Sequence, residues 1–221
     1  MKIKTIEKLE DKITEDFTWR KFELLKLKLA IQNNNTFVGK ETFIRTGVAL
    51  LCAHWEGLIR TVANYYIIFI SCQSLKCNLL TDNFLALKLK SDFKTTGESS
   101  KSSVHARFLD KIEEQKNSNF YFRYVDADGK RIINTESNLS YILFVEILKT
   151  INLENKYEIK QNYIDSEMLK VRHEIVHGEK VKLDSYDFDN TYKQVMDIME
   201  DFTKQVIEAA ENKRYLKNGN N

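Results

Sequence analysis

The chain has 221 residues, no proline, seven glycines and a formal net charge of +2. This length suits one well-packed domain, and without proline nothing interrupts long helices, so we predict an all-α protein. The 34 lysines and arginines nearly balance the 32 aspartates and glutamates. This balance excludes nucleic-acid binding by bulk charge, and any contact with RNA or DNA must come from a local basic patch.

Cysteine usage and hydropathy predict a cytoplasmic protein without a membrane anchor. Cys52, Cys72 and Cys77 are odd in number and lack metal-ligand spacing, so we expect reduced thiols. Charged residues recur every few positions over residues 1–11, which is unlike the apolar core of a signal peptide. The most apolar run, residues 62–72, is shorter than the roughly 18 residues that a membrane span needs.

Apolar residues at helical spacing predict two long helices in the first third of the chain. The first covers residues 5–32 and is followed by a turn at Asn33-Asn34-Asn35. The second covers residues 41–73, is the most apolar helix of the chain and should supply much of the core. It contains Glu56 beside a core tryptophan. A buried carboxylate requires a partner, so Glu56 is either paired inside the protein or turned to solvent.

Residues 76–136 form an insertion in which the helical pattern weakens. Small polar residues, potential caps and an Asp-Ala-Asp-Gly turn flanked by aromatic and β-branched residues divide this insertion. In order, we predict a helix over 81–89 capped by Thr81-Asp82, a loop over 95–103, a helix over 104–115 capped by Ser103, and a small β-hairpin over 120–133.

Three helices are predicted after the insertion, over residues 139–151, residues 162–177, and from Asp187 or Asp189 to about Tyr215. Residues 216–221 should be a disordered tail. We therefore expect residues 1–221 to form a single domain. Its fold would be an up-and-down bundle of four to five helices with an inserted short helix and a small β-hairpin.

The helix over residues 162–177 concentrates the titratable side chains. It should bury one apolar stripe, formed by Ile164, Met168, Val171, Ile175 and Val176. Arg172, His173 and His177 would then lie on its polar face. Gly178 is expected to end the helix, because glycine is the usual residue just past a helical C-terminus.

One motif on this helix is His173-Glu174-Ile175-Val176-His177, which matches the H-E-x-x-H pattern of zinc peptidases. Two imidazoles one turn apart bind zinc there, and the glutamate activates a water. A third ligand is required. Lys180 and Leu183 stand where the extended motif needs glycine and histidine, although Glu200 remains available. We expect no metal and no cofactor.

The overlapping motif is Arg172 followed after four residues by His177, a pair suited to holding a phosphate and moving a proton beside it. With a polar residue after the arginine, this Arg-x4-His motif resembles that of HEPN domains. Residues 51–60, Leu-Cys-Ala-His-Trp-Glu-Gly-Leu-Ile-Arg, also resemble the Trp-Glu-Gly helix of stand-alone HEPN proteins encoded near restriction and abortive-infection genes. The resemblance covers about residues 41–215. Glu179 replaces the tyrosine of HEPN toxins modified by a nucleotidyltransferase, which argues against regulation by that route.

The resemblance implies a metal-independent endoribonuclease that acts on RNA as a toxin or phage-defence effector. It leaves open whether a cognate antitoxin or a defence-system partner binds the protein. His177 would take a proton from a ribose 2′-OH, leaving a 2′,3′-cyclic phosphate and a 5′-OH. Arg172 would hold the scissile phosphate, with His173 donating to it or orienting His177, and Glu56 fixing Arg172. The expected substrate-binding residues are Lys170, Lys180 and Lys182, which would contact the RNA.

Arg172 and His177 are about 140° apart on an ideal helix, which fits a homodimer that completes the site across a two-fold axis. Two alternatives stay open. In one, the same helices form a non-catalytic dimerisation or partner-binding module, with Arg172 in a surface ion pair with Glu167 or Glu174. The other is the zinc peptidase. His54 and His105 are interpreted as packing or surface residues.

Overall fold

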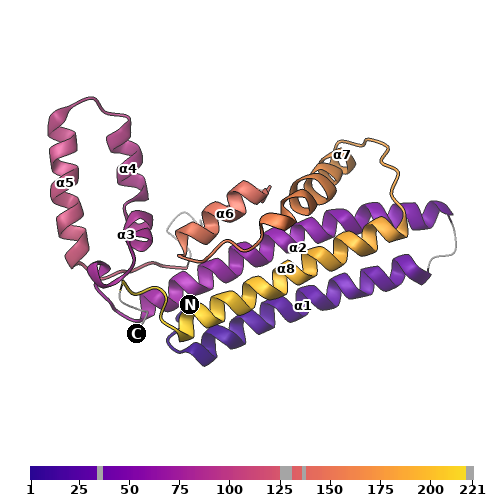
Figure 1. Cartoon of the computed structure of the whole chain (residues 1–221), viewed down its shortest axis with the longest axis horizontal. Coiled ribbons are helices and arrows are strands. Elements are labelled where there is room, and N and C mark those ends of the chain that lie inside the picture. Colours follow the sequence, from indigo (N-terminus) through magenta and orange to yellow (C-terminus); the bar gives the residue numbers. More distant parts are fainter. Residues whose placement is uncertain (34–36, 125–130, 136–137, 218–221) are drawn as a thin grey trace.

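Three long helices running side by side form the body of the protein (Figure 1). They are α1 (Ile6–Asn33), α2 (Phe37–Cys72) and α8 (Ser185–Glu211), and each contacts the other two. The computed structural model describes residues 1–33, 37–124, 131–135 and 138–217. The turn predicted at residues 33–35 therefore lies mostly outside the described residues. Within them, no helix is long and apolar enough to cross a membrane.

A second layer of shorter helices covers α2 and α8. α6 (Tyr141–Thr150) packs through Phe144, whose ring lies 4.9 Å from that of Trp55 on α2 and 5.8 Å from that of Phe202 on α8. All three rings are fully buried, and burying each contributes on the order of 1.5–3 kcal/mol. The expected all-α bundle is confirmed: the described residues contain eight α-helices and no β-sheet.

The insertion contains an arm that projects from the bundle (Figure 1). After η1 (Cys77–Leu79) and α3 (Asp82–Lys88), α4 (Lys90–Gly97) and α5 (Ser102–Asn117) pair with each other. Phe93 and Phe108 meet edge to face at 4.9 Å, and Lys111 pairs with Asp92 at 2.5 Å. Two boundary predictions were wrong. α4 extends into the expected loop, and Lys101 rather than Ser103 is the residue before α5.

The β-hairpin predicted over residues 120–133 is not formed by the described part of this segment. Its turn, residues 126–129, lies outside the described residues. The flanking backbone instead bonds to side chains of α2: Phe122 N–H donates to Ser71 Oγ at 2.9 Å, and Ile133 N–H donates to Asn64 Oδ1 at 3.1 Å. Because α2 takes up these donors, the two flanks do not pair with each other.

The last helix begins earlier than the sequence suggested. Asp184 is the N-cap, and its carboxylate accepts from the backbone of Tyr186 and Asp187 at 2.8 and 2.9 Å. Asp187 bonds back to the Asp184 backbone and so completes a capping box instead of capping the helix itself. Past α8, Lys217 N–H donates to Leu79 O at 3.0 Å. The start of the expected tail is therefore attached, and residues 218–221 lie outside the described residues.

Candidate functional site

The predicted helix over residues 162–177 has two parts. Tyr163–Lys170 (η3) is a π-helix, and Val171–Val176 (α7) is α-helical. π-Helical turns close i→i+5 hydrogen bonds and change the angular phase of the side chains. Ile164 and Met168 are buried as expected, but Val176 is 59% exposed. The predicted buried stripe is therefore wrong at its carboxyl-terminal end, where α7 presents an apolar side chain to solvent.

Gly178 ends α7 as predicted. Its φ of +78° lies in the left-handed region, where a residue with a Cβ is strained. Gly178 N–H donates to Ile175 O, and Glu179 N–H donates to Glu174 O, a pairing that closes the last carbonyls of the helix as a Schellman motif. Arg45 of α2 then donates to Glu179 O at 2.8 Å. This contact joins residues far apart in the sequence, so no local sequence pattern predicts it.

His173 and His177 lie together on the exposed side of α7. Their ring centroids are 4.2 Å apart, with an interplanar angle of 53°. Both residues are exposed, as is Val176 between them. His177 N–H donates to His173 O at 3.0 Å, so the helical backbone places the two side chains one turn apart on the same face. The structure thus brings together two of the predicted site residues at the end of α7.

Arg172 lies at the start of α7 and faces α2. It is half-buried and lines a cleft of about 250 Å³ that is also lined by Cys52, Glu56 and Arg60. His177 does not line this cleft. Among the described residues, Arg172 has no hydrogen bond and no ion pair. The guanidinium therefore does not form the surface ion pair with Glu167 or Glu174 that the non-catalytic alternative expected.

Glu56 enters the same cleft from α2 but does not pair with Arg172. Its Oε1 accepts from Thr135 Oγ1 at 2.6 Å and lies 3.5 Å from Arg60 Nη1. Glu56 is thus the paired, half-buried carboxylate of the two alternatives left by the sequence. Arg60 was not among the predicted site residues. Its only sequence signal is the position one helical turn after Glu56, on the same face of α2.

Cys52 forms a wall of the cleft beneath the two arginines. Burial raises the pKa of its thiol to about 12, an effect that Arg172 opposes and Glu56 reinforces. Both charged groups are therefore close enough to act on the sulfur. The thiol stays protonated at neutral pH. Since the thiolate is the reactive form of cysteine, Cys52 is inert as a nucleophile, and all three cysteines are free.

The residues around Glu56 fix α2 in place. Trp55 Nε1 donates to Leu139 O at 3.1 Å, which ties the segment before α6 to α2. On the opposite side, Gly57 allows the Arg20 guanidinium of α1 to lie against α2. Next to it, His54 is buried, with Nε2 2.7 Å from Glu23 Oε2. His54 is therefore a packing residue, as interpreted, and burial lowers its pKa.

The predicted substrate-binding lysines are exposed but not all together. Lys180 and Lys182 line a groove of about 650 Å³ at the amino-terminal part of α2, together with Lys40. Glu41, Asp184 and Asp187 also line it, so its charge is mixed. Lys170 lies before α7 and does not line this groove.

The sequence matches a family model described as RiboL-PSP-HEPN over residues 15–212. The chain belongs to the RiboL-PSP-HEPN family. This confirms the HEPN resemblance drawn from the Arg-x4-His and Trp-Glu-Gly motifs. No curated protein and no solved structure matched the chain. As a HEPN domain, the chain is assigned at a coarse level to nucleases or RNA-related modules, and HEPN domains often bind RNA or dimerise.

The zinc-peptidase interpretation finds little support in this HEPN chain. Within the described ranges, no three His, Cys, Asp or Glu side chains are grouped so that they could hold a metal ion. Glu200, the carboxylate left open as a third ligand, accepts from Lys204 Nζ at 2.8 Å. Glu200 lines a groove with Lys21 of α1, and neither His173 nor His177 lines that groove.

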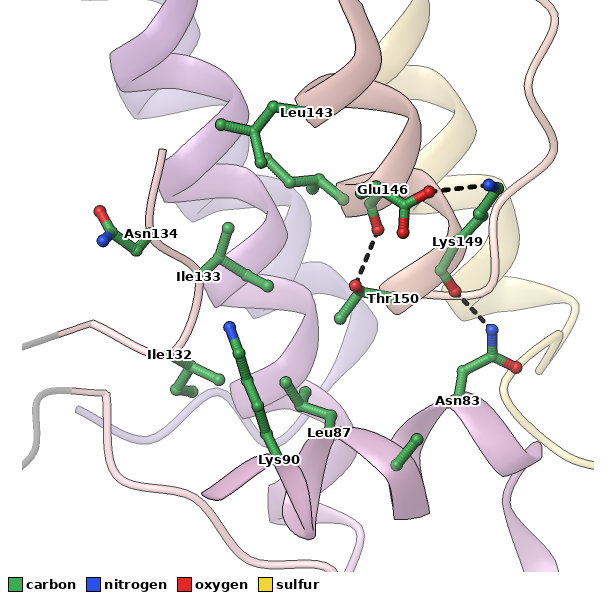
Figure 2. A pocket seen from close by; sticks show the side chains of 12 residues that line it. Asn83, Leu87, Lys90, Ile132, Ile133, Asn134, Leu143, Glu146, Lys149 and Thr150 are labelled. Atoms are coloured by element: carbon green, nitrogen blue, oxygen red, sulfur yellow. Dashed lines mark hydrogen bonds and ion pairs between the residues drawn. The ribbon is translucent and has the colours of Figure 1, made fainter. Parts of the chain in front are cut away.

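A further cavity, of about 410 Å³, lies between α3, α6 and the segment before α6 (Figure 2). Its walls are largely apolar, with Leu87, Ile132, Ile133 and Leu143. Figure 2 shows two interactions on its rim: Glu146 pairs with Lys149 at 2.7 Å, and Asn83 donates to Lys149 O. None of the HEPN motif residues lines this cavity, so it is separate from the candidate site.

Proposed function

We propose that the protein is a metal-independent endoribonuclease that cleaves RNA through Arg172 and His177. The observation that carries the proposal is the arrangement of α7 in a HEPN chain. An arginine without a counter-ion among the described residues lies in the first turn of the helix, and the exposed pair His173 and His177 lies one turn apart beside it. Arginine binds phosphate through two parallel hydrogen bonds, and imidazole is the usual group for proton transfer near neutral pH.

In the proposed reaction, Nε2 or Nδ1 of neutral His177 removes the proton of a ribose 2′-OH. The resulting oxygen attacks the adjacent phosphorus and the bond to the 5′-oxygen of the next nucleotide breaks. That oxygen takes a proton from water and leaves as a 5′-OH, and His177 returns its proton to the solvent. The other product ends in a 2′,3′-cyclic phosphate. Arg172 binds the phosphate and offsets the negative charge that grows on it in the transition state. His173, in ring contact with His177, orients it or donates to the phosphate.

The proposed site is completed in a homodimer. Arg172 faces α2, whereas His177 lies outside that cleft, so one chain does not direct both groups to one phosphate. A second copy packed against α7 would cover the exposed Val176 and bring its own His177 to the first copy's Arg172. Lys180 and Lys182 would contact RNA beyond the cleaved bond.

Cleavage of RNA in the presence of EDTA tests the catalytic proposal. His177→Ala should lower kcat by about 10²–10⁴-fold, and Arg172→Gln by about 10²–10³-fold. His105→Ala is the matched control, since His105 is exposed on α5 and, among the described residues, its side chain bonds only to Ser99 O. Mass spectrometry should find the cyclic phosphate, and a 2′-deoxy substitution at the cleaved position should abolish cleavage. Undiminished activity of His177→Ala would refute the proposal.

Mixing two inactive variants tests the dimeric site. If each site takes Arg172 from one protomer and His177 from the other, an Arg172→Gln and His177→Ala mixture forms hybrid dimers with one intact site. Random exchange of subunits should then restore about a quarter of the wild-type sites. No recovery, despite dimers in analytical ultracentrifugation, would place both groups in one protomer.

The biological role we propose is that of a toxin or phage-defence effector. Expression of the wild-type chain in a bacterial host should arrest growth and fragment RNA, while His177→Ala should do neither. Normal growth at a verified expression level, together with cleavage in vitro, would separate the enzymatic activity from a toxic role and would point to an absent partner or trigger.

A further inference from the structure

The cleft in front of Arg172 contains a second arginine with spare hydrogen-bonding capacity. Cys52, Glu56 and Arg60 follow one another at intervals of four residues, so they lie along one face of α2. Arg172 faces this row from α7, and Asn138 closes the cleft from the segment before α6. The charged groups that line the cleft are two guanidinium groups and one carboxylate, which leaves a net positive charge.

The described partners do not satisfy the two arginines. Arg60 Nη1 lies at 3.5 Å from both Glu56 Oε1 and Thr135 Oγ1, the outer limit of a hydrogen bond. Arg60 Nε is buried and has no partner among the described residues. Arg172 makes neither a hydrogen bond nor an ion pair there. A buried or half-buried guanidinium without an acceptor is unfavourable, and the favourable arrangement is one in which an anion fills the cleft.

We propose that this cleft binds one phosphate group of an RNA strand, with Arg60 acting as a second phosphate-binding residue beside Arg172. The inference rests on the proposed function and extends it. Guanidinium groups match the tetrahedral oxygens of phosphate through paired hydrogen bonds. Glu56 does not take part in binding. It holds Arg60 by the ion pair, and Thr135, fully buried, holds Glu56.

The size of the cleft indicates how much of a nucleotide enters. Its volume of about 250 Å³ is below the range of about 300–1,000 Å³ typical of small-molecule pockets. It is therefore large enough for a phosphate with its ribose. Along the axis of α7, His177 lies about 7.5 Å from Arg172, at 1.5 Å per residue. One RNA strand can therefore occupy the cleft and still pass the histidine pair.

Arg60→Gln separates a binding role from a catalytic one. Steady-state cleavage of a short single-stranded RNA should show KM raised about tenfold or more with kcat nearly unchanged, the expected loss of a charged hydrogen bond in the bound state. The slope of log KM against log salt concentration should fall by about 0.7, which is the contribution of one phosphate contact in a single-stranded nucleic acid. Arg60→Lys should lie between, because lysine keeps the charge and loses the paired geometry.

Arg107→Gln is the matched control, because it removes one positive charge from α5, outside the cleft. Its KM and salt dependence should equal those of the wild type. Thermal unfolding of each variant shows whether loss of the Glu56–Arg60 ion pair alters the fold. A folded Arg60→Gln protein that matches Arg107→Gln in KM and in salt dependence would overturn the proposal and leave the proposed nuclease intact.

A binding assay without cleavage makes the inference testable even if the nuclease proposal fails. The probe is a fluorescent single-stranded DNA oligonucleotide, which has the phosphates but no 2′-OH, measured by anisotropy. Binding that Arg60→Gln and Arg172→Gln each weaken about tenfold, in a protein that cleaves no RNA, would support the cleft and refute the nuclease. AMP as competitor distinguishes a free nucleotide from a strand. Binding that neither substitution weakens would overturn the cleft proposal.

Discussion

Replacing Gly57 with alanine should lower the free energy of unfolding by about 1–3 kcal/mol. A Cβ at this position would lie 2.5 Å from Arg20 Nη1 and 3.1 Å from Arg20 Cζ, too close for either atom to stay in place. Arg20 cannot move aside freely. It is 8% exposed, and its guanidinium is held by Asp16 through two hydrogen bonds of 2.7 and 3.2 Å.

The magnitude follows from two opposing effects. Displacing Arg20 weakens charge-assisted hydrogen bonds that contribute about 1.5–3 kcal/mol each, and a buried charge left without its partner costs more. Alanine in a helix interior is favoured over glycine by about 1 kcal/mol, which offsets part of this loss. If the contact with Arg20 were unimportant, only the second effect would remain, and Gly57→Ala would be more stable than the wild type.

Urea denaturation followed by circular dichroism measures the difference. Gly97→Ala is the control, because a Cβ there meets nothing within 4 Å, and it should be neutral or slightly stabilising. In an Arg20→Ala background, Gly57→Ala should lose its destabilising effect, as a double-mutant cycle requires for two groups in contact. A Gly57→Ala protein as stable as the Gly97→Ala protein would show that the reasoning is wrong.

Three other changes have expected outcomes. Gly178→Ala should destabilise the protein by about 1 kcal/mol in the same urea assay, because alanine is strained at a φ of +78°, and Gly178→Asn should lose less. Iodoacetamide should modify Cys72 before Cys52 in peptide mapping of the native protein, because a pKa of about 12 lowers the thiolate fraction of Cys52 about a thousandfold from the ordinary 9.0; equal rates would contradict its burial. Since burial lowers the pKa of His54 from 6.5, the unfolded chain binds more protons, and stability should fall as the pH drops below about 6.5. His54→Gln should reduce that pH dependence, and an unchanged slope would exclude His54 as its source.

The long helices were predictable from the sequence because their signals are local. Apolar periodicity placed α1, α2 and α6 within a few residues of their observed ends. The cap of the final helix was placed three to five residues too late, because three aspartates compete for this position. Only the backbone geometry selects Asp184 as the cap and Asp187 as its partner in the capping box. Composition alone ranks the three aspartates equally.

Other features depend on contacts between distant segments, which no local pattern encodes. The flanks of the predicted hairpin have strand-like residues, but Ser71 and Asn64 of α2 provide the hydrogen bonds that a second strand would have provided. The π-helical part of the motif helix also contacts a distant segment. Tyr141 N–H donates to Asp165 at 2.8 Å across from α6. The rotated phase of this helix, and with it the exposure of Val176, is therefore outside what its own sequence determines.

At the candidate site, the sequence proposed the residues and left their pairing open. Arg172, His173, His177 and Glu56 were selected from two motifs, and the structure places Arg172 and Glu56 in one cleft and the two histidines in ring contact. The expected link from Glu56 to Arg172 is replaced by one to Arg60. Which arginine a carboxylate pairs with depends on the position of Thr135, a residue that carries no signal of its own.

The two HEPN motifs of this chain form one structural unit. Trp55 does no chemistry, but its indole anchors the backbone at Leu139 and thereby fixes the wall of the cleft that contains Asn138. Gly57 lets α1 approach the other side of α2, so that α2 is held from both sides where Glu56 and Arg60 project. The Trp-Glu-Gly sequence therefore positions the walls of the cleft that Arg172 lines. A substitution at Trp55 or Gly57 should weaken the proposed phosphate binding, although neither residue would contact the phosphate.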